Sequence, residues 1–239
     1  MHKYGIRVNF AKNILNNLTK QSKSINFSKA LCPDQIVGEV VKSQNGDFLL
    51  QSSRILKRQP ITRPAPNYCV DYSAISRDDY IIFILESPHI KEYDANGKPV
   101  GPACGTNKGE TGYDIEQYLN EVLKKSPLFI GQLRRKKYKL VLLNAVQYQA
   151  SAGTHPLNKK FKEKCWLSFW RSGFKKDLVD RVSAFVSASN ECHIVNLCTI
   201  GLNGLHFRVN AELKKLSISF FEGYHPSVNW TSKGKRMIY

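Results

Sequence analysis

The sequence predicts an α/β protein, a three-layer α/β/α sandwich in which helices cover both faces of a central, mostly parallel four-stranded sheet. Short apolar runs of strand length alternate along the chain with segments that have a helical spacing of apolar residues. Such an alternation is typical of parallel sheets with right-handed crossovers, which place helices on both faces. The expected strands span residues 80–85, 139–143, 193–197 and 216–221, and the expected helices span residues 113–125, 174–187 and 205–213.

Two of these runs, Tyr80–Leu85 and Lys139–Leu143, are almost entirely apolar. A continuous apolar run is typical of a parallel strand that is buried on both faces. The helices are predicted from apolar residues three and four positions apart, which line one helix face. These residues are Ile115, Tyr118, Leu119 and Val122 in the first helix, and Leu178, Val179, Val182 and Phe185 in the second.

Residues 1–75 differ from the remainder and are predicted as an N-terminal basic extension of uncertain fold, followed by one α/β domain over residues 76–239. Residues 8–18 have the spacing of a basic amphipathic helix, and residues 60–66 hold three prolines, as a linker or extended arm would. The chain has 239 residues, of which 42% are hydrophobic, so a sizeable core is expected.

The chain carries 36 Lys and Arg residues against 19 Asp and Glu residues, a formal net charge of +17. A charge of this size is self-repelling unless an anionic partner offsets it, and nucleic acid is the commonest such partner. We therefore expect DNA as the partner; the alternative is a protein that is merely basic. The sequence has no apolar secretory signal and no run of about 18 apolar residues, so we expect no membrane partner and a cytoplasmic monomer.

The six cysteines are scattered along the chain and form no Cys-x-x-Cys pair. Because structural zinc sites use closely spaced ligands, we expect no zinc ribbon and no other metal site. Cys192 and Cys198 lie at an expected strand and are predicted as core thiols.

Three residues that could carry chemistry lie where expected strands end: Glu86, Asn144 and His225. Ligands of parallel sheets bind at the carboxyl ends of the strands, so an acid, an amide and an imidazole are expected at one edge. A carboxylate there can position water or stabilise the positive sugar that forms as a glycosidic bond breaks. Taken alone, Glu86 is better explained as an exposed acid that caps a loop.

The amide of Asn144 interrupts an apolar strand, and a buried amide must be hydrogen-bonded. It can donate to and accept from a base edge at once, although a purely structural amide is an equal alternative. The imidazole of His225 can donate to a base carbonyl that gains negative charge, the alternative being an ordinary loop histidine. His89 is a candidate to line the same pocket, whereas His193 lies in a strand and is predicted to be structural.

The glycine-rich segment 97–105 allows a close approach of backbone to ligand and is predicted as a wall of the pocket. It lacks the Gly-Lys-Ser/Thr ending of a phosphate-binding P-loop. The alternative is an ordinary flexible loop.

Two basic stretches, residues 134–137 and 159–164, suit contacts with DNA phosphates. Aromatic residues that follow basic ones can stack on bases, but we expect Trp166 and Trp170 in the core. The candidate contacts to the DNA backbone are Arg134, Arg135, Lys159, Lys160, Lys233, Lys235 and Arg236.

Three motifs together resemble the uracil-DNA glycosylase superfamily, from about residue 79 to residue 231. Residues 85–105 are most similar to the family-four branch, in which a Glu lies two residues before a Pro and an acidic stretch precedes a Gly-basic-Pro loop. Residues 142–146, Leu-Leu-Asn-Ala-Val, are similar to the family-one strand that carries the base-reading Asn, and residues 225–227, His-Pro-Ser, to the last motif of the superfamily. In the first segment the matching residues are Glu86, Pro88, Glu92, Asp94, Gly97, Lys98 and Pro99.

The resemblance implies roles for these residues. Glu86 would activate or position water, Asn144 would read the base, and His225 would stabilise the departing base anion. Residues 228–230 would be the wedge that enters the duplex as the base flips out. The pocket would be lined by Ser87, Pro88, His89, Val100, Gly101 and Tyr148, with DNA contacts from Ser227, Asn229 and Trp230.

The chain also departs from the superfamily. The aromatic residue that stacks on uracil would fall near Val100, so Tyr148 or Tyr93 is the candidate substitute. The cysteine spacing does not reproduce the family-four cluster ligands, so we expect no iron–sulfur cluster and no cofactor. A non-aromatic floor suggests a bulkier modified pyrimidine, such as the decorated cytosines of phage DNA, and hence a role in defence.

The sequence thus predicts a monofunctional DNA glycosylase that flips a uracil or modified pyrimidine and hydrolyses its N-glycosidic bond without metal. A non-catalytic nucleic-acid-binding protein on the same fold is the first alternative. A nucleotide- or phosphate-handling enzyme that uses the loop 97–105 is the second.

Overall fold

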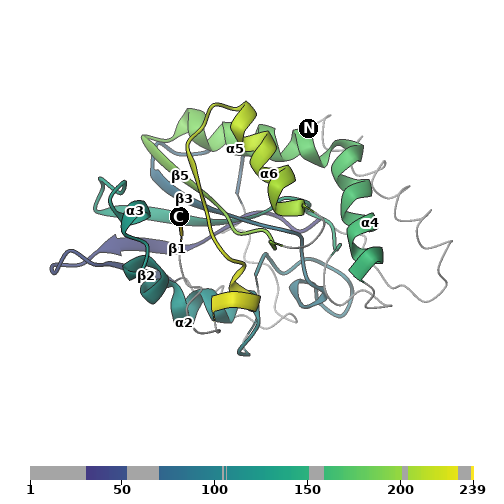
Figure 1. Cartoon of the computed structure of the whole chain (residues 1–239), viewed down its shortest axis with the longest axis horizontal. Coiled ribbons are helices and arrows are strands. Elements are labelled where there is room, and N and C mark those ends of the chain that lie inside the picture. The colour runs from purple at the N-terminus through teal and green to yellow at the C-terminus, as the bar shows by residue number, and fades with distance from the viewer. Residues whose placement is uncertain are drawn as a thin grey trace.

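The computed structural model describes residues 31–52, 70–103, 105, 107–150, 159–200, 204–230 and 238–239. These residues form one six-stranded sheet with helices on both of its faces (Figure 1). The strands are β1 (Gln35–Lys42), β2 (Phe48–Ser52), β3 (Asp79–Leu85), β4 (Lys137–Asn144), β5 (Glu191–Asn196) and β6 (Phe220–Glu222). The helices are α2 (Thr111–Lys124), α3 (Pro127–Ile130), α4 (Lys159–Phe169), α5 (Lys175–Ala188) and α6 (Leu205–Lys215), with short turns η2 (Ile90–Glu92), η3 (Trp170–Phe174) and η4 (Pro226–Trp230).

The parallel part of the sheet confirms the predicted alternation of strands and helices. The strand order is β2-β1-β4-β3-β5-β6, and β4, β3, β5 and β6 run parallel to one another. The side chains of β3 from Tyr80 to Leu85 are all buried, as expected for a strand covered on both faces. The carboxyl ends of these four strands therefore meet at one edge of the sheet.

The predicted four-stranded sheet is corrected to a mixed sheet of six strands. β1 pairs antiparallel with both β2 and β4. Its pairing with β4 runs from Gln35 opposite Leu142 to Val41 opposite Lys137. The β1–β2 turn closes through Gly46, whose φ of 88° lies in the left-handed region that glycine favours. Residues 35–52, placed by the sequence in the N-terminal extension, thus belong to the sheet, whereas the predicted helix 8–18 and the segment 60–66 lie outside the described residues.

The last strand is shorter than the predicted 216–221. Helix α6 ends in a turn in which Ser217 N–H donates to the Lys214 carbonyl at 3.1 Å, and Ser217 has a φ of 53°. Because this conformation cannot continue as extended chain, β6 starts only at Phe220.

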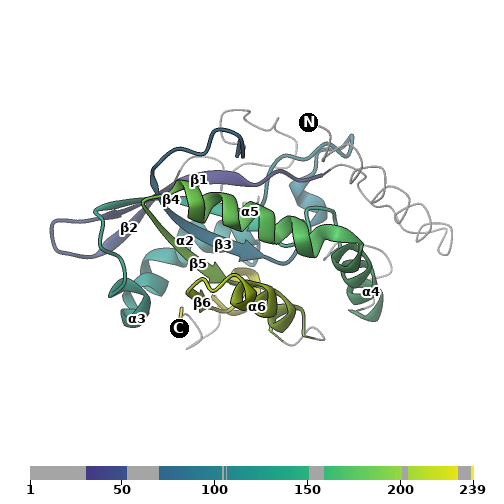
Figure 2. The same ribbon diagram turned by 90° about the horizontal axis from the view of Figure 1, so that it is seen from above.

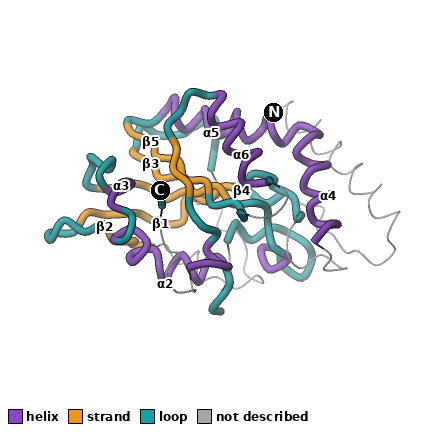
Figure 3. The backbone as a smooth tube through the Cα atoms, viewed as in Figure 1, coloured by secondary structure: helices purple, strands orange, loops and turns teal. Residues whose placement is uncertain are grey.

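The sheet separates two hydrophobic cores, and the views in Figures 2 and 3 show helices on either side of the strands. Helices α4, α5 and α6 cover one face with side chains such as Trp166, Phe185 and Val209. Helices α2 and α3 cover the other face with Ile115 and Phe129. The predicted core positions of Trp166 and Trp170 are confirmed, since both indoles are buried.

The chain returns to the outer edge of β6 at residues 238–239. Glu222 and Tyr239 exchange two backbone hydrogen bonds of 2.7 and 2.8 Å, and Ile238 N–H donates to Ser126 Oγ at 2.8 Å. The segment after β6 is therefore anchored at both of its ends. Within the described ranges, no helix is long and apolar enough to span a bilayer.

The assignment of β1 to the core of the sheet predicts that a charge there unfolds the protein. Val40 on β1 is fully buried, so Val40→Asp should lower the free energy of unfolding by more than about 4 kcal/mol. Leu49 on β2 is 36% exposed, so the control Leu49→Asp should cost about 1 kcal/mol or less. Urea denaturation measures both, and equal costs would show that β1 is not part of the cooperative core.

Candidate active site

The carboxyl ends of β3 and β4 bring two of the predicted residues next to each other. Leu85 and Asn144 are register partners, and Val146 N–H donates to the Glu86 carbonyl at 3.2 Å. Glu86 is 6% exposed and Asn144 is 1% exposed, so neither is a surface residue. The expectation that Glu86 is an exposed loop acid, reasonable for the residue alone, does not hold.

The main chain of Glu86 is fixed from the helical layer. Trp166 Nε1 on α4 donates to the Glu86 carbonyl at 2.9 Å. The Cys198 thiol lies after β5, and its pKa is raised by burial and then by the negative charge of Glu86. The Glu86 carboxylate therefore faces the end of β5, the strand on the other side of β3.

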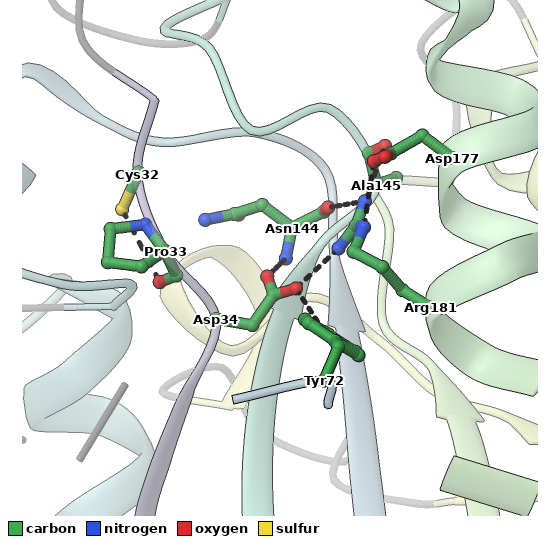
Figure 4. Close-up of polar contacts among 8 residues, drawn as sticks. All are labelled: Cys32, Pro33, Asp34, Tyr72, Asn144, Ala145, Asp177 and Arg181. Carbon is green, nitrogen blue, oxygen red and sulfur yellow. Dashed lines mark hydrogen bonds and ion pairs between the residues drawn. The ribbon is translucent and has the colours of Figure 1, made fainter. Parts of the chain in front are cut away.

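The backbone of Asn144 is held by a buried ion-pair network, shown in Figure 4. Asn144 N–H donates to Asp34 Oδ1 at 3.3 Å, and Arg181 Nη2 donates to the Asn144 carbonyl at 3.0 Å. Arg181 also donates from Nη1 to Asp34 at 2.6 Å and from Nε to Asp177 at 2.8 Å. Tyr72 completes the network by donating its hydroxyl to Asp34 at 2.6 Å.

Burial and charge oppose each other in this network. Burial raises the pKa of Asp34, and the neighbouring Arg181 partly offsets that rise. Burial lowers the pKa of Arg181, but the carboxylates of Asp34 and Asp177 outweigh it and the net shift is upward. The guanidinium is therefore charged and pairs with two buried carboxyl groups at once.

The sequence carries a signal for part of this network. Arg181 lies three residues after Leu178 and four before Phe185, so it shares the inward face of the predicted helix. An arginine on an apolar face needs a buried partner, and Asp177 lies one turn before it. Asp34 could not be foreseen, because it precedes a strand that the sequence did not predict.

A second buried carboxyl, Glu92, lies beside Asn144. Glu92 ends η2 and is 5% exposed, and burial raises its pKa to about 8. Backbone N–H groups of His89 and Ala103 and the side chain of Asn144 oppose this rise. The Asn144 amide is thus close to the carboxyl, yet neither Asn144 Nδ2 nor Glu92 Oε2 has a partner of hydrogen-bond geometry among the described residues.

The imidazole of His225 follows β6 at the same edge of the sheet, two strands away from β3. The loop that carries it starts where Gly223 N–H donates to the Asn196 carbonyl of β5 at 3.0 Å. Nδ1 of His225 lies 2.9 Å from Ser227 Oγ, and burial lowers the pKa of the ring to about 4. The ring is partly exposed at its surface, but the direction of the shift makes it neutral at pH 7.

The ends of β5 and β6 are tied together by His206 of α6. Its Nδ1 lies 2.9 Å from the Cys198 carbonyl, and its Nε2 lies 2.6 Å from Glu222 Oε2. Asn196 Nδ2 donates to Asn210 Oδ1 at 2.7 Å. These contacts fix where the His225 loop leaves the sheet relative to Glu86.

The glycine-rich loop folds against Glu92 and β1. Val100 N–H donates to the Glu92 carbonyl at 2.8 Å, and Val100 is fully buried. Gly101 has a φ of 143°, and a Cβ there would collide with the Gln35 side chain, so only glycine fits. Ser87 and Pro88 are also buried, whereas His89 Nδ1 accepts from Lys91 N–H at 3.1 Å and caps η2.

Tyr148 does not have the position expected of an aromatic residue that stacks on the base. Its ring is fully buried and stacks on Phe169, with 5.4 Å between ring centroids and 12° between planes. The ring belongs to the core beneath α4 and cannot receive a base in this arrangement. Tyr93 is also buried, and burial raises the pKa of its phenol well above the usual value.

Trp230 does not have the position expected of a residue that enters the DNA duplex as part of the wedge 228–230. This indole is 0% exposed, donates from Nε1 to the Tyr224 carbonyl at 2.9 Å and packs edge-on against Phe83. It anchors the His225 loop to the sheet and cannot contact DNA from this position. The side chain of Asn229 lies outside the described residues, and Ser227 is engaged with His225.

The basic residues Arg134 and Arg135 lie at the opposite edge of the sheet. Arg135 Nε is 3.9 Å from Asp79 and 3.6 Å from Glu191, which begin β3 and β5. Seven residues of β3 separate that edge from Glu86, a distance of about 20 Å. A contact of Arg134 or Arg135 with DNA phosphates, which stays a prediction, would therefore lie far from Glu86.

The remaining predicted contacts cannot be placed. Lys159 and Lys160 begin α4, but their side chains are outside the described residues, as are Lys233, Lys235 and Arg236 altogether. His193 is structural as predicted, with Nε2 2.6 Å from Glu191 Oε1. Cys198 is a core thiol, and Cys192 is partly buried.

In the part of the chain that the structure describes, no three His, Cys, Asp or Glu side chains are grouped to hold a metal ion. No protein-family model matches the chain, and no curated protein or solved structure matches it.

The buried arginine gives a stability prediction with a matched control on the same helix. Arg181→Leu removes the cation that pairs with the buried Asp34 and Asp177, and should cost about 3–5 kcal/mol of folding free energy. Lys176 forms an exposed pair with Asp180 at the same spacing, so Lys176→Leu should cost less than about 1 kcal/mol. Thermal denaturation compares them, and a small loss for Arg181→Leu would contradict the proposed role.

The buried Glu92 predicts a pH-dependent stability. Its folded pKa of about 8 lies above the usual 4.5, so the folded state keeps a proton that the unfolded state has released. Wild-type stability should therefore fall as the pH rises from about 4.5 to about 8, and Glu92→Gln should remove this fall. Melting temperatures at pH 5, 6.5 and 8.5 test it, with exposed Glu121→Gln as control; parallel profiles for all three proteins would contradict the burial of Glu92.

Proposed function

We propose that this protein is a monofunctional DNA glycosylase, which hydrolyses the N-glycosidic bond of a flipped uracil or modified pyrimidine and leaves an abasic site. The observation that carries the proposal is the placement of Glu86, Asn144 and His225 at one edge of one sheet. Glu86 and Asn144 are buried on register-paired strands, and His225 follows a strand two positions along. The sequence motifs that resemble the uracil-DNA glycosylase superfamily supply these same residues.

The acid would act on water and on the sugar. Departure of a base from C1′ leaves an oxocarbenium-like sugar, which a nearby carboxylate stabilises. The Glu86 carboxylate would also hold the water that adds to C1′ and accept its proton. The base departs with the electron pair of the broken C1′–N bond.

The imidazole would act on the departing base. A neutral His225 has one N–H, and a Ser227 hydroxyl that donates to Nδ1 would place that hydrogen on Nε2. Nε2–H would then donate to the base carbonyl on which negative charge accumulates. A neutral donor suits this task, because it stabilises the anion without first giving up a proton.

The remaining features of the proposal concern the partner and the biological role. The net charge of +17 supports DNA as the partner. The protein would act as a cytoplasmic monomer and without a cofactor. Val100 stands where the superfamily has an aromatic residue, which supports a modified pyrimidine such as a decorated phage cytosine as substrate. Defence against phage DNA would then be the role, and base-excision repair would be the role if uracil is the substrate.

A non-catalytic nucleic-acid-binding protein is the second candidate. The burial of Tyr148 and Trp230 counts against base stacking and duplex entry, while the net charge of +17 still supports binding of nucleic acid. The two candidates differ in whether anything depends on the Glu86 carboxylate.

Removal of the Glu86 charge should abolish turnover and spare binding. Glu86→Gln keeps the size of the side chain, and the excision rate should fall by about 10²- to 10⁴-fold, the usual contribution of a general base. Strand nicking after alkali measures it on DNA that contains uracil, hypoxanthine, xanthine, hydroxymethylcytosine or glucosylated hydroxymethylcytosine. Exposed Glu121→Gln is the control, and an unchanged rate in Glu86→Gln would refute the assigned role.

A further inference from the structure

We propose that Glu92 and Asn144 form the base-reading pair, and that the presence or absence of a proton on Glu92 selects between cytosine-type and uracil-type bases. The inference rests on the proposed function for its choice of ligand. It assigns a role to Glu92, a residue that the glycosylase chemistry above does not use.

Two buried polar side chains lie side by side: the Asn144 amide acts on the Glu92 carboxyl, but their contact falls short of good hydrogen-bond geometry. Asn144 Nδ2 is a donor, and Glu92 Oε2 is a donor or an acceptor according to its protonation. Neither has a hydrogen bond of good geometry in the described part of the chain. Buried groups of this kind are costly unless something satisfies them, so a ligand that pairs with both would be held strongly.

The backbone of Asn144 and the carboxyl of Glu92 are held before any ligand arrives. Arg181 Nη2 donates to the Asn144 carbonyl at 3.0 Å, and Asp34 Oδ1 accepts from the Asn144 N–H at 3.3 Å. The backbone N–H groups of His89 and Ala103 donate to the Glu92 carboxyl. The Val100 N–H donates to the Glu92 carbonyl. A fixed donor beside a fixed carboxyl can discriminate between ligand edges, because a mismatched edge leaves a buried group unpaired.

The two kinds of pyrimidine need opposite states of the carboxyl. Uracil presents an acceptor, O2, beside a donor, N3–H; Asn144 Nδ2 would donate to O2 and an unprotonated Glu92 Oε2 would accept from N3–H. Cytosine presents two adjacent acceptors, O2 and N3, so Nδ2 would donate to O2 and a protonated Oε2 would donate to N3. A substituent at C5 lies away from this edge, so modified cytosines would be read like cytosine.

The environment keeps the proton on Glu92 near neutral pH. Burial raises the pKa of its carboxyl to about 8, so the protonated form predominates at pH 7 and the ionised form above pH 8. The two phenols nearby, Tyr93 and Tyr148, remain neutral across this range because burial raises the pKa of each. Other titratable or charged residues on the neighbouring segments include Cys32, Asp34, Glu86, His89, Lys91 and Arg181.

The test is the binding of two single-stranded oligonucleotides, each of which contains only adenine apart from one pyrimidine. The pyrimidine is 2′-fluoro-2′-deoxyuridine in one and 2′-fluoro-2′-deoxycytidine in the other, because the 2′-fluorine slows glycosidic cleavage. Dissociation constants are measured at pH 6.5 and pH 8.5. The preference should shift toward the uridine oligonucleotide by up to about 100-fold, since each pH unit changes the ratio of ionised to protonated carboxyl tenfold.

Two variants locate the effect. Glu92→Gln should fold and give the same preference at both pH values, whereas exposed Glu121→Gln should keep the wild-type shift. A wild-type preference that does not change with pH would overturn the inference, and so would an equal shift in Glu92→Gln. If Glu92→Gln does not fold, the wild-type measurement still decides.

The same materials separate this inference from the proposed function. Nicking that depends on Glu86, together with a pH-independent preference, would leave the glycosylase standing and remove the role of Glu92. A pH-dependent preference without nicking of any substrate would keep Glu92 as a base reader in a protein that does not cleave.

Discussion

The buried guanidinium of Arg181 is the constraint on which the rest of the structure depends. One cation on α5 binds Asp34 before β1, Asp177 on its own helix and the carbonyl that ends β4. Without it, two buried carboxylates and a carbonyl would lose the cation that binds all three. The network therefore fixes the antiparallel addition of β1 to the parallel sheet, and it fixes the place where Asn144 leaves β4.

The candidate site is built outward from that fixed point. Asn144 is anchored by its backbone, which leaves its amide directed toward Glu92, and β3 places Glu86 beside it. On the far side, His206 ties β5 to β6, and the His225 loop begins just beyond. The carboxyls of Glu86 and Glu92 thus lie at one edge of the sheet in different environments. A difference of this kind allows one acid to carry charge while the other keeps its proton.

The parallel strands and their helices could be predicted because their signals are local. Continuous apolar runs identify β3 and β4, and a three- and four-residue spacing identifies α2 and α5. β1 was missed because Gln35, Gly38 and Glu39 interrupt its apolar pattern, and because its partner β4 lies about 100 residues away along the chain. A strand of this kind is defined by its pairing and not by its composition.

Part of the site could also be predicted, because its residues lie at the ends of strands that have local signals. Strand ends place Glu86 and Asn144 at one edge, and this required only the order of the strands. The exposure of Tyr148, Trp230 and Arg135 could not be derived, because it depends on which loop packs on which face. Glu92 appears in the sequence motif, but its importance comes from burial, which only the folded chain reveals.

The central claim is that Glu86 at the end of β3 drives release of a base from DNA. Its most direct test is mass spectrometry of the small molecules freed when the protein is incubated with DNA that contains modified pyrimidines. The account predicts a free pyrimidine base that is released by the wild-type chain and absent with Glu86→Gln, while both proteins bind the DNA equally. A base released equally by both proteins, or DNA bound with no base released by either, would contradict it.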